Sequence, residues 1–258
     1  MNKYLKCINY LISRKTVKLQ HLLNVYNLLR KWNCNEDICF AGLFYNIYLD
    51  KIETDRNIIK KLIGDKAEEL IFNKEKNIVH MAITMSNSYI NIIDNVFDHE
   101  DIVQNHLYFR DIVNWNFIGS GTRPPNKWRK FNYQLNFSNK LEKKFKSQAN
   151  NILNNLNFKK FVKLKRTYAS ASPYGTVLES HSDSDQGITV MFYLNQHWNI
   201  DYAGETVFHK NGDIIRSIIP KPGRVVVFDG SIEHCARDVR RDYNDLRMVL
   251  TFKYDIVT

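Results

Sequence analysis

The sequence predicts an α+β protein in which a small helical N-terminal domain precedes a strand-rich domain. Apolar residues recur at helical spacing through about the first 80 residues, whereas from residue 161 onward short β-branched and aromatic runs alternate with turn residues. Many short strands at this spacing are typical of a sandwich or a double-sheet jelly roll. With 258 residues, including 15 Phe, 14 Tyr and 4 Trp, the chain can bury a sizeable core, and general disorder is excluded.

The first domain is expected to contain three helices. Residues 17–32 place leucines and Tyr26 on one face at helical spacing. A second helix begins after Asn35, with two acids in its first turn, and its apolar residues continue to Tyr48. A third is expected over residues 57–72. We therefore place a helical domain at residues 1–85.

The second domain, residues 86–258, is expected to be mainly β-structure. Residues 119–128 have the Gly and Pro content of a loop, and the Lys- and Asn-rich residues 139–160 are expected to be helical. Six runs then have the composition of strands: 161–168, 188–195, 205–210, 213–220, 224–230 and 247–254.

Several classes of protein are excluded by composition. No apolar run approaches the roughly 18–20 residues that span a bilayer, and residues 1–14 lack the apolar core and cleavage site of a signal peptide. The four cysteines form no CxxC pair, so neither a disulfide framework nor a structural zinc site is expected. We expect a cytoplasmic protein with no membrane segment, whose oligomeric state the sequence does not determine.

Positive charge is concentrated in the middle of the chain. The formal net charge is +10, but residues 123–166 alone carry 13 basic residues and one acid, Glu142. A solvated Lys-rich helix is the ordinary explanation for such a segment. The alternative is a surface that attracts an anionic substrate or partner, because aromatic residues are interleaved with the charges.

Three residues in the strand-rich half could form a metal site. His181 and Asp183 follow a strand expected at Thr176–Ser180, and residues two apart on an extended chain point to the same side. His234, from a later strand, would complete a set of two histidines and one carboxylate, which leaves coordination positions open on non-haem Fe(II). Taken alone, each of these residues would more often be structural.

Arg247 begins a strongly apolar strand 13 residues after His234. A buried guanidinium that stays charged is suited to bidentate capture of a carboxylate. Taken alone, Arg247 would more often be a solvated charge at the end of a strand.

The ordered motifs HSD, FYLN, GET, PKPGRVVVFDG, IEHCARDV and RMVLTF resemble those of Fe(II)- and 2-oxoglutarate-dependent oxygenases of the prolyl 4-hydroxylase type. The likeness covers about residues 165–256 and extends more weakly back to about residue 90. It implies a double-stranded β-helix (jelly-roll, cupin-like) domain that uses Fe(II), the co-substrate 2-oxoglutarate and O2. Ascorbate is a candidate reductant.

The resemblance also implies roles for individual residues. His181, Asp183 and His234 match the iron ligands. Arg247 and Tyr193 match the residues that bind the distal carboxylate of 2-oxoglutarate, and Tyr168 matches a tyrosine that lines the co-substrate pocket. One position departs from the family pattern: many relatives have Ser or Thr two residues after the basic residue, where this chain has Val249.

The N-terminal residues 21–48 resemble a small family of HD-like helical domains. A working HD phosphohydrolase needs a His-Asp doublet to hold its metals, but the matching stretch here is Phe44-Tyr45-Asn46. We expect a degenerate HD-like domain over about residues 1–80, without a metal motif and with an accessory role.

These observations predict a dioxygenase that hydroxylates a C–H bond of a peptide, protein or amino-acid-derived substrate. Two alternatives are an oxygenase acting on a nucleic acid or a small natural product, and a catalytically silent binding module on the same fold. Release of succinate from 2-oxoglutarate would separate an enzyme from a silent module.

Overall fold

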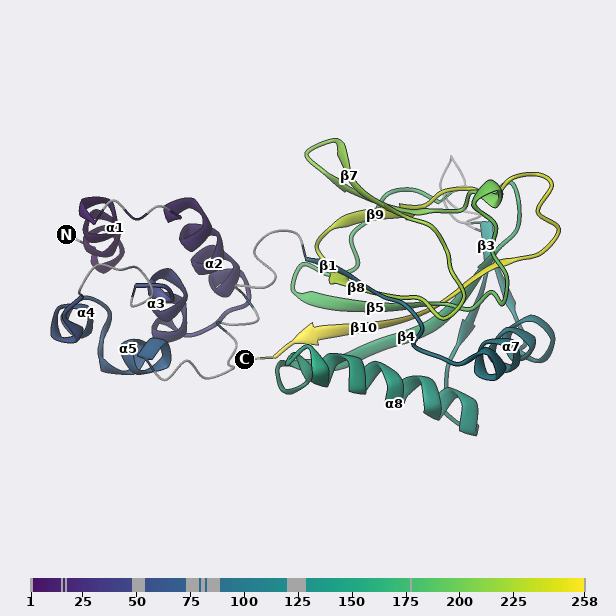
Figure 1. Cartoon of the computed structure of the whole chain (residues 1–258), viewed down its shortest axis with the longest axis horizontal. Helices are drawn as coiled ribbons and strands as arrows, with labels where there is room; N and C mark the ends of the chain where they lie inside the picture. Colours follow the sequence, from purple (N-terminus) through teal and green to yellow (C-terminus); the bar gives the residue numbers. More distant parts are fainter. Residues whose placement is uncertain are drawn as a thin grey trace. The chain divides into compact units, whose positions relative to one another are not determined.

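The computed structural model describes residues 2–257 except 15, 17, 48–53, 73–78, 80–81, 83–88, 120–128 and 177. The chain divides into two compact units, residues 1–89 with 257–258 and residues 90–256 (Figure 1). Within the described residues, no helix combines the length and the apolar character needed to cross a bilayer.

The first unit is helical. Its helices are α1 (Lys3–Ser13), α2 (Leu19–Lys31), α3 (Glu36–Phe44), α4 (Arg56–Ile63) and α5 (Asp65–Phe72). The single helix expected over residues 57–72 is wrong. Gly64 has φ +97°, a conformation that ends a helix and that glycine adopts without strain, so α4 and α5 are separate helices.

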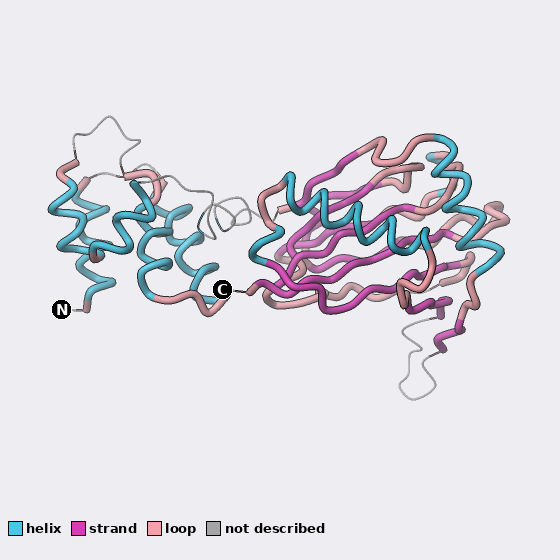
Figure 2. The backbone as a smooth tube through the Cα atoms, turned by 90° about the horizontal axis from the view of Figure 1, so that it is seen from below, coloured by secondary structure: helices cyan, strands magenta, loops and turns pink. Residues whose placement is uncertain are grey.

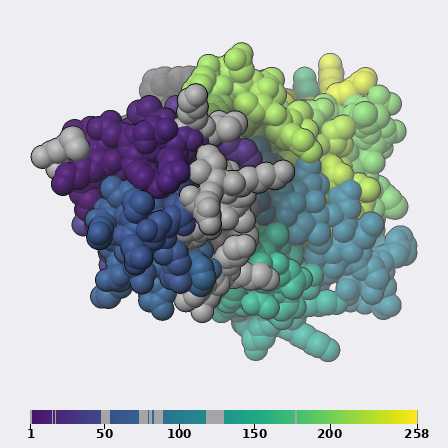
Figure 3. All heavy atoms as spheres, turned by 60° about the vertical axis from the view of Figure 1, so that its left-hand side comes forward, coloured from purple at the N-terminus to yellow at the C-terminus, as the bar shows by residue number. Residues whose placement is uncertain are grey.

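Local capping and an ion pair with one buried partner stabilise the helix ends in this unit. As its position before two acids predicted, Asn35 caps α3 by accepting a hydrogen bond from the backbone N–H of Ile38 (3.0 Å). At the start of α4, Arg56 makes a two-pronged contact of 2.7 Å and 2.7 Å with the buried carboxylate of Glu68 on α5. Figure 3 shows the atoms of the first helices, in purple, against those of α4 and α5, in blue.

The second unit contains two antiparallel sheets. The larger has the order β1-β8-β5-β10-β4-β3-β2 and the smaller the order β7-β6-β9. The strands are β1 (Ile90–Ile93), β2 (Asn116–Gly119), β3 (Arg129–Gln134), β4 (Val162–Ser172), β5 (Gly187–Tyr193), β6 (Thr206–Lys210), β7 (Asp213–Ile218), β8 (Val225–Asp229), β9 (Glu233–Ala236) and β10 (Arg247–Ile256). Buried residues of both sheets form one core cluster, which includes Met191, Tyr193, Phe208 and Phe228. The inner face of the large sheet therefore packs on the small sheet.

Helices cover the opposite face of the large sheet. Figures 1 and 2 show α8 (Lys140–Asn155) lying across its strands, on the side away from β7 and β9. Phe145 of α8 packs edge-on against Phe192 of β5, with ring centroids 5.3 Å apart. Phe192 alternates along β5 with Met191 and Tyr193, which face the small sheet. Covering on both sides explains why every residue of β5 is buried and why all but Thr189 lack a charged or hydroxyl-bearing side chain up to the terminal Tyr193.

The expected strands 161–168, 188–195, 205–210, 213–220, 224–230 and 247–254 correspond to β4, β5, β6, β7, β8 and β10. The strand expected at Thr176–Ser180 is wrong: the described residues of this segment have no regular strand. Leu178 takes part in an isolated bridge, and His181 forms another with His234. Most of the expected loop 119–128 lies outside the described residues.

Helical segments also join or cover these strands: α7 (His99–Leu107), the π-helical turn Tyr108–Ile112, α8, and a 3₁₀ turn at Ile200–Tyr202. The helix expected over residues 139–160 ends at Asn155, and a short 3₁₀ turn, Lys159–Phe161, leads into β4. The lysines of α8 are exposed on the helix that covers the outer face of the large sheet, and Lys144 forms an ion pair with Asp101 of α7. This part of the basic segment 123–166 is therefore a solvated Lys-rich helix, the first of the two explanations considered for the segment.

Glu142 is fully buried at the start of α8, and its carboxylate joins three segments of the chain. Oε1 accepts hydrogen bonds from the hydroxyls of Tyr108 (2.9 Å) and Tyr133 (2.7 Å), and Oε2 accepts one from the backbone N–H of Phe137 (2.7 Å). The single acid of the basic segment is therefore a structural residue that ties α8 to β3 and the π-helical turn.

We predict that Glu142→Ala lowers the free energy of unfolding by about 2–4 kcal/mol, because three donors lose a charged acceptor in a buried place. Denaturant titration of the full chain measures this. The control is Glu100→Ala, an exposed acid on α7, which should change stability by no more than about 0.5 kcal/mol. Equal stability of the two variants would contradict the structural role of Glu142.

Candidate metal centre

The segment that carries His181 and Asp183 is held by backbone hydrogen bonds to the later strands. His181 and His234 exchange both of their backbone bonds, N–H to carbonyl, at 3.1 Å and 2.9 Å. The N–H of Asp183 donates to the carbonyl of Gly230 (2.7 Å), and the N–H of Gly230 donates to the carbonyl of Gly187 (2.8 Å). Residues separated by about 50 positions in the chain are thereby brought side by side.

His181, Asp183 and His234 are the residues that converge. One potential ligand atom from each lies within 4.8 Å of the other two. Among the His, Cys, Asp and Glu side chains of the described residues, these three lie close enough together to hold a metal ion. The Nε2 atom of His181 lies 3.6 Å from Oδ1 of Asp183, and that of His234 lies 3.7 Å from Oδ2.

Hydrogen bonds determine which nitrogen of each imidazole is available. Nδ1 of His181 lies 3.1 Å from the carbonyl of Glu179, and Nδ1 of His234 lies 2.9 Å from the carbonyl of Ile232. A carbonyl only accepts, so both Nδ1 atoms carry the proton, and Nε2 keeps a lone pair directed at the centre. Burial lowers the pKa of both histidines, which keeps them neutral, as metal ligands must be.

Asp183 stays ionised although its side chain is 2% exposed. Burial by itself would raise the pKa of this carboxyl, but the ammonium of Lys253 and a hydrogen bond from Thr189 favour the charged form, and the pKa lies below its ordinary value. Oγ1 of Thr189 donates to Oδ2 at 2.6 Å, and Nζ of Lys253 lies 2.5 Å from Oδ1. Two neutral imidazoles and one oriented carboxylate are the donor set of a non-haem iron site, so the residues fit this metal.

A cavity extends from these three residues between the two sheets. Its lining includes the candidate metal ligands, Arg247 and Tyr168. The other lining residues are Lys130, Ser170, Ser172, Leu178, Thr189, Met191, Thr206, Phe228, Ala236, Val249 and Thr251.

Arg247 is a buried cation in the wall of this cavity, 3% exposed. Its Nε donates to the carbonyl of Gly204 (2.6 Å), and Nη2 donates to Oγ1 of Thr206 (2.8 Å). No Asp or Glu among the described residues forms an ion pair with it. A buried guanidinium held only by neutral acceptors attracts an anion from the cavity.

The two tyrosines predicted from the resemblance occupy different places. Tyr168 lines the cavity. Tyr193 is buried beside it: its hydroxyl lies 2.7 Å from Oγ1 of Thr206 and donates to the carbonyl of Ile218 (3.3 Å), and its ring lies 5.6 Å from the guanidinium of Arg247. Tyr193 thus contacts Arg247 and Thr206 behind the cavity wall, and its direct bond to a co-substrate stays a prediction.

Sequence reasoning missed Lys253, Thr189 and Thr206. Lys253 lies six residues after Arg247 on β10, so the two-residue period of a strand places both on the cavity side. The strand period could have placed Lys253 on the cavity side, but it could not show that Lys253 pairs with Asp183. Val249 also lines the cavity, and its neighbour across the β10–β4 ladder, Ser170, supplies a hydroxyl to the same wall.

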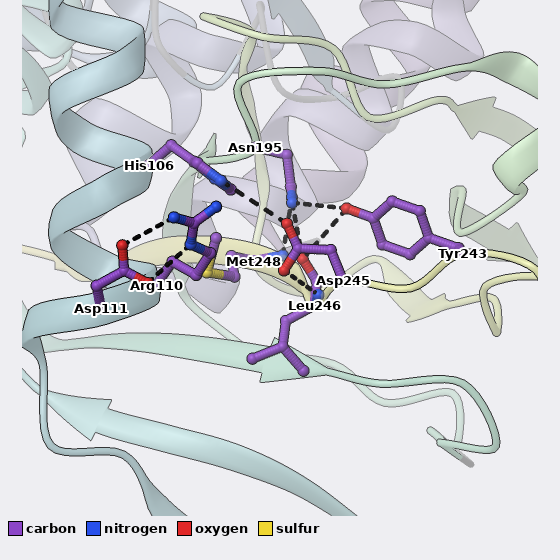
Figure 4. A network of polar contacts seen from close by, with 8 residues as sticks. All are labelled: His106, Arg110, Asp111, Asn195, Tyr243, Asp245, Leu246 and Met248. Atoms are coloured by element: carbon purple, nitrogen blue, oxygen red, sulfur yellow. Dashed lines mark hydrogen bonds and ion pairs between the residues drawn. The ribbon is translucent and has the colours of Figure 1, made fainter.

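Asn195 holds the backbone on both sides of Arg247, as Figure 4 shows. Its side-chain amide donates to the carbonyl of Leu246 (2.7 Å) and to the hydroxyl of Tyr243 (3.0 Å), and its oxygen accepts from the N–H of Met248 (2.9 Å). These bonds fix the start of β10 and therefore the direction in which Arg247 leaves the strand.

Two family models match parts of the chain. Residues 168–254 match the 2OG-Fe(II) oxygenase superfamily, and residues 11–73 match a domain of unknown function, DUF6817. No curated protein matches the chain. The match to DUF6817 says nothing of an HD-like origin, which stays a prediction.

Solved structures share the fold of the second unit at low sequence identity. A prolyl hydroxylase from Trichoplax adhaerens, in complex with a peptide fragment of the hypoxia inducible factor oxygen degradation domain, has TM-score 0.54 and 16% identity and covers 67% of this chain and 86% of its own. A prolyl-4-hydroxylase from Pseudomonas putida has TM-score 0.53 and 14% identity, with 68% and 96% covered. HygX from Streptomyces hygroscopicus, with nickel and 2-oxoglutarate bound, has TM-score 0.51 and 11% identity, with 68% and 85% covered.

The second unit is therefore a 2OG-Fe(II) oxygenase domain with the double-stranded β-helix fold, resembling prolyl hydroxylases, and the protein is an oxidoreductase of this superfamily. The family and the convergence of His181, Asp183 and His234 imply Fe(II) and 2-oxoglutarate as its cofactors.

We predict that Asn195→Ala weakens 2-oxoglutarate binding by about tenfold and lowers the free energy of unfolding by about 2–3 kcal/mol, because buried backbone groups beside Arg247 lose their partners. The 2-oxoglutarate affinity and the stability of Asn195→Asp should lie between those of the parent and of Asn195→Ala, since aspartate keeps an acceptor for the N–H of Met248. Calorimetric titration with 2-oxoglutarate and denaturant unfolding supply the two measurements. The control is the exposed Asn199→Ala, which should leave 2-oxoglutarate binding unchanged; the same result for folded Asn195→Ala would refute its positioning role.

Proposed function

We propose that His181, Asp183 and His234 hold Fe(II), that Arg247 binds the distal carboxylate of 2-oxoglutarate, and that the protein hydroxylates a C–H bond of its substrate. The observation that carries this proposal is one cavity that joins three metal-ligand side chains to a buried arginine with no described acidic partner. When bound, iron and 2-oxoglutarate would supply the oxidising chemistry, in which O2 is consumed, 2-oxoglutarate becomes succinate and CO2, and a substrate C–H bond is hydroxylated.

The residues around the proposed site hold the metal ligands and Arg247 in position. The carbonyls of Glu179 and Ile232 hold the imidazoles with Nε2 directed at the metal position. Thr189 and Lys253 each hold one oxygen of Asp183, so the carboxylate cannot rotate away from that position. Arg247 keeps its charge while buried, and Thr206 connects it to Tyr193.

The prolyl hydroxylase resemblance favours a peptide, protein or amino-acid-derived substrate. The fold hosts many substrates, so the matched family by itself leaves the substrate open. Tyr168 and Tyr193 are proposed to shape the co-substrate pocket, and O2 and, as a reductant, ascorbate are proposed to take part in turnover. The four cysteines are all free thiols, and Fe(II) needs a reducing environment, so a cytoplasmic location is proposed.

The helical unit is proposed to be a non-catalytic accessory domain, with the domain boundary at residues 85–86. The support is the sequence Phe44-Tyr45-Asn46 at the place where an HD domain needs a His-Asp doublet. The side chain of His21 packs edge-on against the ring of Tyr45, with centroids 5.8 Å apart.

A catalytically silent module on the same fold is the alternative. It would be favoured by loss of a ligand or of the basic residue, and all four residues are present in one cavity. Succinate formation from 2-oxoglutarate, with Fe(II) and ascorbate and with candidate peptides, separates the two. No succinate above a metal-free control, in any substrate mixture, would support the silent module.

We predict that His181→Ala, Asp183→Ala and His234→Ala each abolish stoichiometric Fe(II) binding and succinate formation while the protein stays folded, because three ligands are the minimum for this centre. Metal content after anaerobic loading and circular dichroism measure the two properties. His197→Ala, which removes an exposed histidine, is the control and should keep full metal content. Iron content equal to that of the parent in Asp183→Ala would show that the ligand set is wrong.

We predict that Arg247→Leu weakens 2-oxoglutarate binding by roughly 30- to 5000-fold, the equivalent of about 2–5 kcal/mol for one partner of a desolvated charge pair. Arg247→Lys should lose less, because lysine keeps the charge and loses the planar fork. Iron content should be nearly unchanged in both. Arg216→Leu, on the exposed side of β7, is the matched control. Parent-like affinity for 2-oxoglutarate in folded Arg247→Leu would exclude this role.

A further inference from the structure

Lys253 places a positive charge against one of the candidate metal ligands. Its Nζ lies 2.5 Å from Oδ1 of Asp183, and the side chains of the lysine and the aspartate are 15% and 2% exposed. The other carboxylate oxygen, Oδ2, accepts a hydrogen bond from the hydroxyl of Thr189 (2.6 Å). The two oxygens of Asp183 therefore have different partners: one is a neutral hydroxyl, and the other is an ammonium that brings a charge to the site.

The register of the large sheet fixes the position of Lys253. On β10 it is directly opposite Thr189 of β5 on one side and Arg166 of β4 on the other. Directly opposite residues point to the same face, so both partners of Asp183 come from one row across the sheet. The like charge of the exposed Arg166 repels the ammonium of Lys253, which lies against the aspartate instead. Nζ also lies 5.2 Å from the centroid of the Tyr168 ring, which lines the cavity.

A charge in this position discriminates between the two oxidation states of iron. The carboxylate of Asp183 is the anionic side chain of the proposed ligand set, and the ammonium competes with the metal for its negative charge. Fe(III) carries one positive charge more than Fe(II), so both this competition and the direct repulsion by the ammonium are stronger for Fe(III). Because Lys253 and Asp183 are shielded from water, solvent screens these interactions little. The ammonium should therefore favour the ferrous ion, whereas the neutral Thr189 orients the carboxylate without this preference.

We propose that Lys253 is a positioning residue that also keeps the bound iron ferrous, by placing its charge against Asp183. The inference rests on the proposed function and adds control of the oxidation state to it. The step concerned is a one-electron oxidation: Fe(II) loses an electron to O2 and becomes Fe(III), O2 becomes superoxide, and one electron from ascorbate restores Fe(II). A centre that retains Fe(II) in this way needs less ascorbate to stay active.

An anaerobic redox titration of the iron-loaded full chain, without substrate, tests the proposal. The electron paramagnetic resonance signal of Fe(III) reports the oxidised fraction at each potential. Lys253→Gln keeps a donor for Asp183 but removes the charge, and it should shift the equilibrium towards Fe(III) by about tenfold or more. For a one-electron couple, tenfold corresponds to a reduction potential about 59 mV lower. Lys253→Arg keeps the charge, so its equilibrium should stay within about threefold of that of the parent.

Two control variants separate charge from orientation. Lys165→Gln breaks a second Lys–Asp ion pair between β4 and β10, with Asp255 (3.0 Å), at an exposed position, and should leave the potential unchanged. Thr189→Val removes the neutral partner of Asp183; it should weaken the binding of Fe(II) and Fe(III) alike and also leave the potential unchanged. A fall in potential as large in Thr189→Val as in Lys253→Gln would overturn the proposal, because loss of orientation would then explain both.

Folding of Lys253→Gln is checked by circular dichroism, because the variant leaves a buried carboxylate without its cation. The variant is purified with Fe(II) present, so that the metal supplies the missing positive charge. Lys253→Met, whose unbranched side chain fills the same space, is the second neutral variant and should show the same fall in potential. Equal potentials in the parent and in either folded neutral variant would overturn the role of Lys253.

The role of Lys253 and the proposed function fail separately. The redox titration needs bound iron but neither substrate nor turnover. A lower potential in Lys253→Gln, together with a parent that forms no succinate, would support the role of Lys253 and overturn only the proposed hydroxylase. Succinate formation by the parent, with equal potentials in the parent and in Lys253→Gln, would overturn only the role of Lys253. A parent that takes up no Fe(II) would overturn both.

Discussion

The carboxylate of Asp183 is the point on which the oxygenase unit depends. It is nearly inaccessible to water, yet neighbours on two strands keep it ionised: the hydroxyl of Thr189 on β5 and the ammonium of Lys253 on β10. A buried charge is costly unless it is paired and hydrogen-bonded, so those strands must meet correctly before the carboxylate is stable. The metal-ligand position is therefore coupled to the pairing of β5 with β10.

Two other buried charged side chains, Glu142 and Arg247, are also held by hydrogen bonds to partners from other segments of the chain. Glu142 connects α8 to β3 and the π-helical turn through three hydrogen bonds, and Arg247 is held by Gly204 and Thr206 at the start of β6. Their partner sets differ in one respect. Glu142 is fully satisfied by protein donors, which suits a structural residue, whereas Arg247 has only neutral acceptors and faces a cavity. The difference distinguishes a charge that holds the fold from one available to a ligand.

The chemistry of the site was predictable to the extent that it depends on short-range geometry. His181 and Asp183 are two residues apart, and His234 follows the turn after β8. The residue types and their order along the chain were therefore enough to propose that these three residues form one site. The expected strand before His181 did not form, and His181 pairs with His234 of β9 through an isolated bridge. The residues converge all the same, since the backbone bonds of His181 and Asp183 hold the segment without a regular ladder.

The sequence by itself determined the division into a helical part and a strand-rich part and the positions of six strands, because apolar periodicity acts over a few positions of the chain. It also singled out the candidate metal ligands and Arg247, through their order and their resemblance to a known family. Only the tertiary structure decided which cations meet: that Lys253 lies against Asp183, that Arg166 is opposite Lys253, and that Lys130 reaches the same ring while the α8 lysines belong to the outer face. Sheet register and the choice of face are set by packing between distant segments, and no local pattern records them.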